Sequence, residues 1–356
     1  MDILLMIAYL TIVLSVLVVI HEGGHYLASR AFGVRVTEFM IGMPGPNIGV
    51  TIGGTKFGVT PILLGGYARV CGMEAGPEMP RLKEVLAYAY THGTVLADQM
   101  ALDLDMSVEE AIDTLYELAE WGCVNPPARK DQHNVFRTRP LKDKKRGLDL
   151  AEGTPREFHS AEELYQTERS QMYRSLPFWK RSVILLAGIL VNLLFAVAMI
   201  VLIYSVIGVD VTLADGTVTH VTLNVATALQ AGFGYIFEVA KAILGLFNPQ
   251  TAAETVSNST SVVGIAVMSK EYAEAGILMF MLFMAMISVS LGLMNLLPIP
   301  PLDGGRFVVE IFQKITGIQV GQRAMNVMSA VGMALFVLFF LVMLNQDINR
   351  FVFGNW

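Results

Sequence analysis

Four long apolar stretches constrain this chain more than any other feature of its sequence. Their approximate bounds are Ile3–Ile20, Phe178–Ile207, Ile277–Leu297 and Ala324–Leu344. A helix needs about 20 predominantly apolar residues to cross the hydrocarbon core of a bilayer. Only 16% of the residues are charged, against about 25% in typical soluble domains. The sequence therefore predicts a polytopic α-helical membrane protein with four transmembrane helices.

The first apolar stretch is expected to be retained as a span rather than removed as a signal peptide. Met1-Asp2 carries no positive charge, and no small-x-small cleavage site precedes His21. A secretory signal peptide would have both features. Residues 1–33 are therefore interpreted as the first transmembrane segment.

Two polar motifs close two of these stretches. His21-Glu22-Gly23-Gly24-His25 ends the first, and Asn295-Leu-Leu-Pro298-Ile-Pro300-Pro-Leu-Asp303-Gly304-Gly305 ends the third, within residues 277–305. Residues i and i+4 of a helix lie on one face, so His21 and His25 can bind one zinc ion. Glu22 is then placed to take a proton from the attacking water. This is a metalloprotease pattern inside a membrane protein.

A catalytic zinc ion takes three protein ligands and leaves a fourth position open. Asp303 is the best candidate for the third ligand, because a carboxylate at the end of an apolar span is costly unless a metal or a partner offsets it. The prolines ahead of Asp303 break the helix. Irregular backbone at membrane depth is tolerated only where it lines a protein cavity or water. The predicted metal ligands are therefore His21, His25 and Asp303, with Glu22 as general base.

The basic residues predict the orientation. Nineteen of the 25 lysines and arginines lie between Arg30 and Arg181. Loops rich in lysine and arginine stay on the cytoplasmic side. Both termini are therefore expected to be extracytoplasmic, and both motifs to lie toward the cytoplasm. We expect a multi-pass protein of the cell membrane, of the bacterial inner-membrane type.

Residues 34–72 are predicted to form short strands beside the membrane. They are rich in glycine, threonine and β-branched residues, with turns at Pro44-Gly45-Pro46, Gly53-Gly54 and Gly65-Gly66. A sheet edge at this place can pair with an extended substrate backbone. A purely structural hairpin packed on the spans is an equal alternative.

Residues 81–127 are predicted to form a small helical cytoplasmic insert. Ser107 and Glu110 form a capping-box start for a helix over residues 111–119. The pattern from Leu96 to Val124 resembles a helix-turn-helix or winged-helix module. The helix that would read DNA carries no lysine or arginine but five acidic residues, Glu109, Glu110, Asp113, Glu117 and Glu120.

Acidic side chains have the wrong sign for phosphate, and the net charge of −6 gives no nucleic-acid footprint. We therefore expect no nucleic-acid partner for the insert. Contact with a cytoplasmic protein, or a scaffolding role, is the favoured interpretation. Residues 128–175 are charged and weakly periodic, so they are predicted to be a linker with partial disorder.

Residues 208–276 are predicted to form an extracytoplasmic loop. It should contain a hairpin around Asp215-Gly216 and an amphipathic helix over residues 226–247. Glu238 and Lys241 would be costly in hydrocarbon, so an interfacial helix is favoured. A fifth span is the alternative.

The motifs together resemble the site-2 proteases, a family of zinc intramembrane metalloproteases. The likeness covers HExxH, Leu64-Gly65-Gly66-Tyr67, Gly188-x-x-x-Asn192 and the motif from Asn295 to Gly305. It extends over all four spans. Because HExxH lies so near the N-terminus, the chain is most similar to the branch that contains the bacterial regulator of sigma-E protease.

The resemblance implies that His21, His25 and Asp303 hold zinc and that Glu22 is the general base. It also implies that Asn295 positions substrate or donates a hydrogen bond on the oxyanion side, and that Asn192 is a second polar group near the cleft. A helix-packing hydrogen bond is an equal interpretation of Asn192. Members of this branch usually carry PDZ domains between the second and third spans, but residues 208–276 are too short and lack the expected Gly-Asp turn.

Two functions from different classes follow. The first is a zinc-dependent endopeptidase that cleaves a transmembrane segment of a single-span protein, such as an anti-sigma factor or a remnant signal peptide. The alternative is a non-catalytic membrane adaptor that binds transmembrane helices and recruits a cytoplasmic partner. The intact Glu22 and the three candidate ligands argue against the adaptor.

Overall fold

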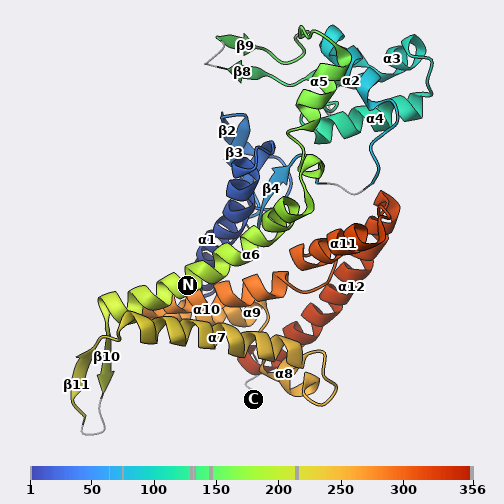
Figure 1. Ribbon diagram of the computed structural model, residues 1–356. Coiled ribbons are helices and arrows are strands. Elements are labelled where there is room, and N and C mark those ends of the chain that lie inside the picture. The colour runs from blue at the N-terminus through green and yellow to red at the C-terminus, as the bar shows by residue number, and fades with distance from the viewer. Residues whose placement is uncertain are drawn as a thin grey trace.

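Four long apolar helices form the body of the protein. The computed structural model describes residues 2–352 except 64, 74–75, 129–130, 132–133, 144–146 and 213–215. In that part of the chain, four helices are long and apolar enough to cross a membrane, as predicted. They are α1 (Asp2–Ala31), α6 (Phe178–Val201, continued by the π-helical turn η2, Leu202–Ile207), α10 (Ile277–Asn295) and α12 (Gln322–Asp347). Figure 1 shows them below the insert that contains α2, α3 and α4.

The α1 and α6 helices pack closely because small residues face each other. A Cβ atom added to Gly24 would lie 2.6 Å from the carbonyl oxygen of Ala187. Glycine at this position therefore lets the two backbones approach, as small residues do between membrane helices. On its other side, α6 packs along α10. This three-helix unit holds both motifs.

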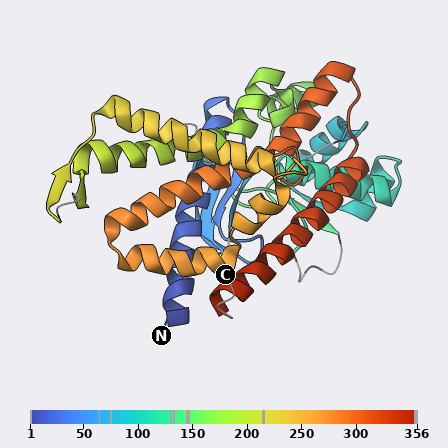
Figure 2. The same ribbon diagram turned by 90° about the horizontal axis from the view of Figure 1, so that it is seen from below.

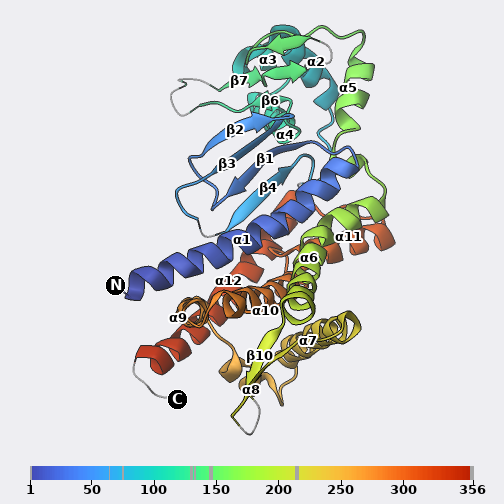
Figure 3. The same ribbon diagram turned by 90° about the vertical axis from the view of Figure 1, so that its left-hand side faces the viewer.

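The segment 34–72 forms a four-stranded sheet beside α1 (Figure 3). Its strands are β1 (Val36–Ile41), β2 (Ile48–Ile52), β3 (Thr55–Val59) and β4 (Gly66–Val70), in the order β2-β3-β1-β4. The β2–β3 pair is an antiparallel hairpin, whereas β1 pairs with β3 in parallel and with β4 antiparallel. Leu64, in the turn before β4, lies outside the described residues. Among the described strands, β4 is an edge strand next to α1.

The insert combines three helices with a three-stranded sheet. The elements are α2 (Leu82–His92), β5 (Thr94–Leu96), α3 (Ala97–Asp103), α4 (Val108–Glu120), β6 (Val124–Asn125) and β7 (Val135–Thr138). The sheet order is β5-β7-β6. The sequence predicted a helical insert over residues 81–127, whereas in the structure the helices are joined by a sheet whose strand β7 lies beyond residue 127. Ser107 caps α4 by accepting a 3.1 Å hydrogen bond from the backbone N–H of Glu110.

The interpretation of residues 128–175 as a partly disordered linker is wrong for the described part of this segment. It contains β7, β8 (Leu141–Asp143), β9 (Leu148–Leu150), α5 (Ala161–Arg169) and the short helix η1 (Tyr173–Ser175). Phe136, Leu164 and Met172 are buried in the same core as α2 and α4. These three apolar side chains are far apart in the sequence. The segment therefore shows no helical or strand-like period of hydrophobic residues.

The insert is attached to the end of α1 through a buried ion pair. The Arg35 guanidinium donates to Glu168 at 2.7 Å, to the Gln171 side chain at 3.0 Å and to the carbonyl of Trp121 at 3.1 Å. Burial, the largest single cause, would raise the pKa of Glu168, but the charge of Arg35, the hydrogen bonds from Tyr90 and Arg35 and the charge of Arg156 together hold this pKa below its ordinary value. The contact joins the chain just after α1 to both α4 and α5.

Residues 208–276 contain a hairpin and three helices in place of a PDZ domain. The hairpin is β10 (Val209–Thr212) with β11 (Val218–Val221), and Asp215 of its turn lies outside the described residues. The predicted amphipathic helix is α7 (Val225–Gly245), which packs on α6 and α10 and does not rank among the four candidate spans. It is followed by α8 (Ala252–Asn258) and α9 (Val262–Glu274). The α9 helix was not predicted from the sequence; it packs against both α1 and α10.

The last two helices lie at the periphery. A Pro-rich turn joins α10 to α11 (Asp303–Thr316), and α12 then runs along the outside of the other helices (Figure 2). The chain described here ends in η3 (Ile348–Val352). In Figure 3 both chain ends lie on the side away from the insert.

Candidate active site

The two histidines of HExxH lie one turn apart near the end of α1. This helix continues without a break to Ala31, which places His21 and His25 on the same face. Both are buried, and their Nε2 atoms are 3.4 Å apart. The structure thus brings the pair together as the spacing predicts.

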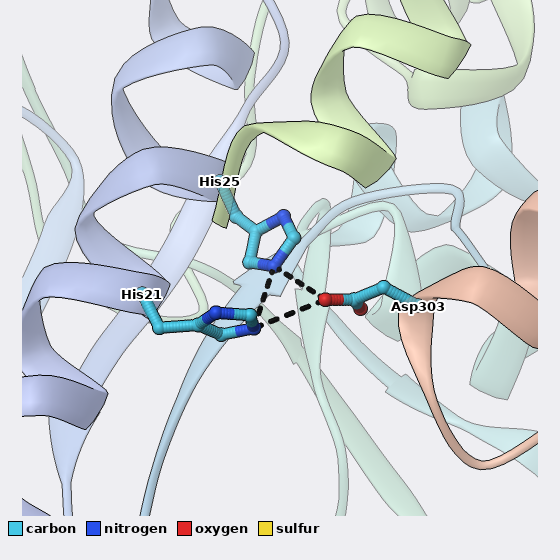
Figure 4. A group of neighbouring side chains, drawn as sticks. All are labelled: His21, His25 and Asp303. Carbon is cyan, nitrogen blue, oxygen red and sulfur yellow. Dashed lines mark hydrogen bonds and ion pairs between the residues drawn. The ribbon is translucent and has the colours of Figure 1, made fainter. Parts of the chain in front are cut away.

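Asp303 reaches the same point from the other end of the chain. The Pro-rich turn ends α10, and Asp303 is the first residue of α11. Its Oδ2 atom lies 3.0 Å from Nε2 of His21 and 3.1 Å from Nε2 of His25. Figure 4 shows the three side chains converging from two different elements.

The Nδ1 atom of each imidazole, which faces away from Asp303, contacts a polar group of α6. His25 Nδ1 lies 2.8 Å from the carbonyl oxygen of Ile184, which can only accept, so Nδ1 carries the proton and Nε2 a free lone pair. His21 Nδ1 lies 3.3 Å from the Asn192 amide nitrogen, while Asn192 Oδ1 is buried without a hydrogen-bond partner among the described residues. The orientation of an asparagine amide is assigned from its hydrogen bonds. If the Asn192 amide is rotated by 180°, Oδ1 faces His21 and accepts a hydrogen bond from His21 Nδ1–H. Both Nε2 atoms then present lone pairs toward Asp303.

This donor set fits a zinc ion. Its three atoms are 3.0–3.4 Å apart. A tetrahedron with metal–ligand bonds of ~2.0–2.1 Å has edges of roughly 3.3 Å. Among the described residues, it is the one group of three or more His, Cys, Asp or Glu residues with ligand atoms this close together. Two imidazoles and one carboxylate would leave the fourth position free, as in catalytic zinc sites.

Glu22 is fixed to the neighbouring sheet. Its Oε2 atom accepts a 2.9 Å hydrogen bond from the backbone N–H of Ala68 in β4. The general-base candidate is thus held between the HExxH helix and a sheet edge. Ala68 was not predicted as a site residue, because every residue except proline has a backbone N–H and its identity does not reveal this contact.

Glycines make room for the site. A Cβ atom on Gly188 would lie 2.5 Å from His25 Nε2 and 2.8 Å from His21 Cε1. A Cβ on Gly304 or Gly305 would collide with the carbonyl oxygens of Leu296 and Ile299. Gly188 therefore clears space for the imidazoles, and the paired glycines let α11 begin tightly against the Pro-rich turn.

The two predicted substrate-binding asparagines are placed differently. Asn192 is fully buried in α6, contacts His21 and accepts at its backbone carbonyl a 2.9 Å hydrogen bond from Ser288. Asn295 is the last residue of α10, and its side chain makes no hydrogen bond with the described residues. Only Asn192 is brought into contact with the metal-ligand candidates.

Comparison with known proteins agrees with this geometry. The model of peptidase family M50 matches residues 9–339. The chain belongs to this family. It is therefore an intramembrane metalloprotease and zinc-dependent, as the family's members are. Its four apolar helices make it a multi-pass membrane protein.

Two of the relatives below are similar over nearly their whole length, and a third over a shorter segment. The regulator of sigma-W protease RasP of Bacillus subtilis is 24% identical, with 95% of this chain and 97% of that protein covered. A Clostridium acetobutylicum protein provisionally named a zinc metalloprotease is 24% identical over 94% of both chains. The zinc metalloprotease RasP of Geobacillus kaustophilus is 39% identical, but over only 25% of this chain and 21% of its own. These findings do not favour the adaptor.

Proposed function

We propose that His21, His25 and Asp303 hold the catalytic zinc and that Glu22 is the general base for hydrolysis of a peptide bond in a transmembrane segment. The observation that carries this proposal is the convergence of the three ligand atoms within 4.8 Å of one another. Membership of family M50 supports the same chemistry.

Bound zinc would act as a Lewis acid that polarises the scissile carbonyl and acidifies the attacking water. The protein supplies the proton transfers. Glu22 takes the proton of the water and delivers it to the leaving amine. The Ala68 N–H fixes one carboxylate oxygen of Glu22 and leaves the other to accept that proton. Asn192 and the Ile184 carbonyl keep the two imidazoles in the tautomer that binds metal.

The substrate must be extended before it can be cut, because a hydrogen-bonded helix hides its carbonyls. The edge strand β4 offers a template for this extended form, beside the residue that holds Glu22. Asn295, at the end of α10, is the candidate for a further hydrogen bond to the unwound segment.

The substrate class that fits is a single-span protein whose segment enters the site from the bilayer. An anti-sigma factor or a remnant signal peptide meets that description, and the Bacillus subtilis relative is named for sigma-W regulation. The insert and both motifs lie toward the cytoplasm in this proposal, and both termini are outside the cytoplasm in the cell membrane. Residues 81–127 are available for a cytoplasmic protein partner.

The test is proteolysis by the purified full chain in proteoliposomes made from native membrane protein extracts. Mass spectrometry of new termini should find cuts inside predicted transmembrane segments with the wild type and none with Glu22→Gln. The purified wild type should contain close to one zinc ion per chain, and Glu22→Gln should retain it. Cuts confined to soluble loops, or undiminished cutting by Glu22→Gln, would refute the proposal.

A further inference from the structure

One face of α6 positions both histidines of the candidate site. The carbonyl oxygen of Ile184 lies 2.8 Å from His25 Nδ1. The Asn192 side chain lies 3.3 Å from His21 Nδ1. Gly188 lies between these two positions and leaves the space that the imidazoles occupy. Positions 184, 188 and 192 are spaced by four, so they share one face of the helix. The third ligand candidate belongs to another helix, α11, and needs a support of its own.

Asp303 depends on α11 for its position. Among the described residues, the hydrogen bonds of its carboxylate go to the two histidines alone. Asp303, Phe307 and Glu310 are spaced by four and three positions, which places them on one face of α11. Phe307 packs against an apolar cluster that includes Ile184 and Leu185, so this face is turned to α6, beside which α11 lies in Figure 3. The direction in which Asp303 points is therefore set by how α11 is held against α6.

Glu310 is buried on this face of α11 and meets the beginning of α6. Its exposed fraction is 8%. Arg181 Nη1 lies 3.2 Å from Glu310 Oε2, and the Tyr173 hydroxyl donates to Glu310 Oε1 at 3.3 Å. Arg181 stands three positions before Ile184, so it continues the same face of α6. The face of α6 that positions the two histidines therefore also holds α11, through Glu310.

The contact between α6 and α11 depends on charge. Glu310 Oε2 and Arg181 Nε are buried and have no aligned hydrogen bond with the described residues, although the two side chains lie at ion-pair distance. Glu310→Gln would keep an oxygen for the Tyr173 hydroxyl but would leave the guanidinium without this opposite charge. A buried ion pair adds little net stability, because desolvation offsets the attraction, whereas loss of one member leaves the other uncompensated. Such a pair fixes where α11 lies more than it stabilises the fold.

We propose that Glu310 is a positioning residue for the metal site, and that it acts on Asp303 through α11. Seven residues separate the two carboxylates, about 10 Å along the helix, so Glu310 does not reach the metal. Its pair with Arg181 holds the start of α11 against α6 and directs Asp303 to the point where the two imidazoles meet. Without that pair, α11 shifts on α6 and carries Asp303 with it. This inference rests on the proposed function, because it takes Asp303 as the third ligand.

The test measures metal binding by the purified full-length chain, with Zn²⁺ and Co²⁺ as probes. Competition with a chelator gives the zinc affinity, and the visible absorption spectrum of bound Co²⁺ reports the geometry of the ligands. Partners that orient metal ligands typically contribute about 10–100-fold to metal affinity. We expect Glu310→Gln to lower zinc affinity about tenfold, at the weak end of this range because it acts through a helix, and to change the Co²⁺ spectrum.

Three matched variants accompany Glu310→Gln. Glu310→Asp keeps the negative charge and should recover most of the zinc affinity. Arg181→Gln should reproduce the loss, and the double variant Arg181→Gln with Glu310→Gln should lose no more than either single change, because both act through one contact. Lys314→Gln, an exposed change on the same helix, should leave the zinc affinity and the Co²⁺ spectrum unaltered.

Wild-type zinc affinity and an unaltered Co²⁺ spectrum in Glu310→Gln would overturn the inference, even if less folded protein is recovered, because a merely structural role lowers the yield without changing the site. If Glu310→Gln cannot be purified in folded form, Tyr173→Phe decides. Loss of this one hydrogen bond should lower zinc affinity about threefold, and an unchanged affinity overturns the inference.

Asp303→Ala separates this inference from the proposed function. If Asp303→Ala loses zinc while Glu310→Gln binds it as the wild type does, only the positioning role of Glu310 fails. If Asp303→Ala keeps full zinc occupancy, the proposed ligand set itself fails, and the positioning role fails with it.

Discussion

Asp303, which is partly buried, and Glu168, which is buried, are two carboxylates that differ in what surrounds them. Glu168, in the insert, accepts from the Arg35 guanidinium at 2.7 Å and from the Tyr90 hydroxyl at 2.9 Å. Asp303 faces two imidazole nitrogens at 3.0 and 3.1 Å. A buried charge needs a partner of opposite sign. The chain itself supplies a cation to Glu168, whereas the Asp303 cluster presents three electron-pair donors, and in the proposed site a metal ion would be their partner.

The largest expected effect is loss of the metal on Asp303→Ala. Removing one of three ligands should reduce bound zinc to background and abolish cleavage. Elemental analysis of the purified variant beside Glu22→Gln, which keeps the ligand set, measures the difference. Full zinc occupancy in Asp303→Ala would assign the third ligand to another residue.

Glu168→Gln should disturb the insert and spare the metal. Removing one partner of a buried ion pair leaves Arg35 uncompensated, which typically costs about 3–5 kcal/mol. Hydrogen exchange of β7 and α5 should become faster, with zinc content unchanged. The control is Glu162→Gln, whose pair with Lys83 is exposed and should be dispensable. Zinc loss in Glu168→Gln would show that the two carboxylates are not independent.

Asn192→Ala should weaken zinc binding without preventing it. Residues that hydrogen-bond a metal-ligating histidine typically contribute about 10–100-fold to metal affinity, so zinc competition with a chelator should reveal a loss in that range. Saturating zinc should restore full content. Asn295→Ala, which lacks this contact, should keep wild-type affinity. Equal affinities for wild type and Asn192→Ala would leave Asn192 a helix-packing role.

Mild acid should loosen the attachment of the insert, with the smallest effect of the four. Because the folded-state pKa of Glu168 lies below its ordinary value of 4.5, its contribution to stability is complete above about pH 4.5 and falls as the pH drops further. Limited proteolysis between α5 and α6 should therefore accelerate below that pH in the wild type. The acceleration should be absent from Glu168→Gln. The same pH response in both proteins would assign it to other groups.

The sequence revealed the site more completely than the insert, for a physical reason. The spacing of His21 and His25 on one helix is a moderate signal alone, and it becomes a strong one together with the aspartate after a Pro-broken span. Ala68 acts through its backbone, and Asn192 acts through a partner in another helix. Asn192 was a candidate from the Gly188-x-x-x-Asn192 pattern, but its contact with His21, like the contact of the Ala68 N–H with Glu22, could be found only once the elements were placed.

The fold was predictable where hydrophobicity is periodic or continuous. The four spans are of this kind. The Ser107 cap was predictable for another reason, because a serine three residues before a glutamate marks a helix start. Residues 128–175 are not, because Phe136, Leu164 and Met172 are isolated among charged residues yet buried. Their burial depends on a core whose other buried residues lie between Cys71 and Val124 in the sequence, and this long-range packing cannot be predicted from a local window.

The 282 positions between His21 and Asp303 set an order of events during biogenesis. His21 and His25 leave the ribosome first, but the third ligand candidate is synthesised only after α10. Metal binding is coupled to assembly of its ligands, so in the proposed site a newly made chain would acquire peptidase activity only after Asp303 has been synthesised and placed beside the histidines. Membrane proteins synthesised beside it would be protected until then from an enzyme that is still being made.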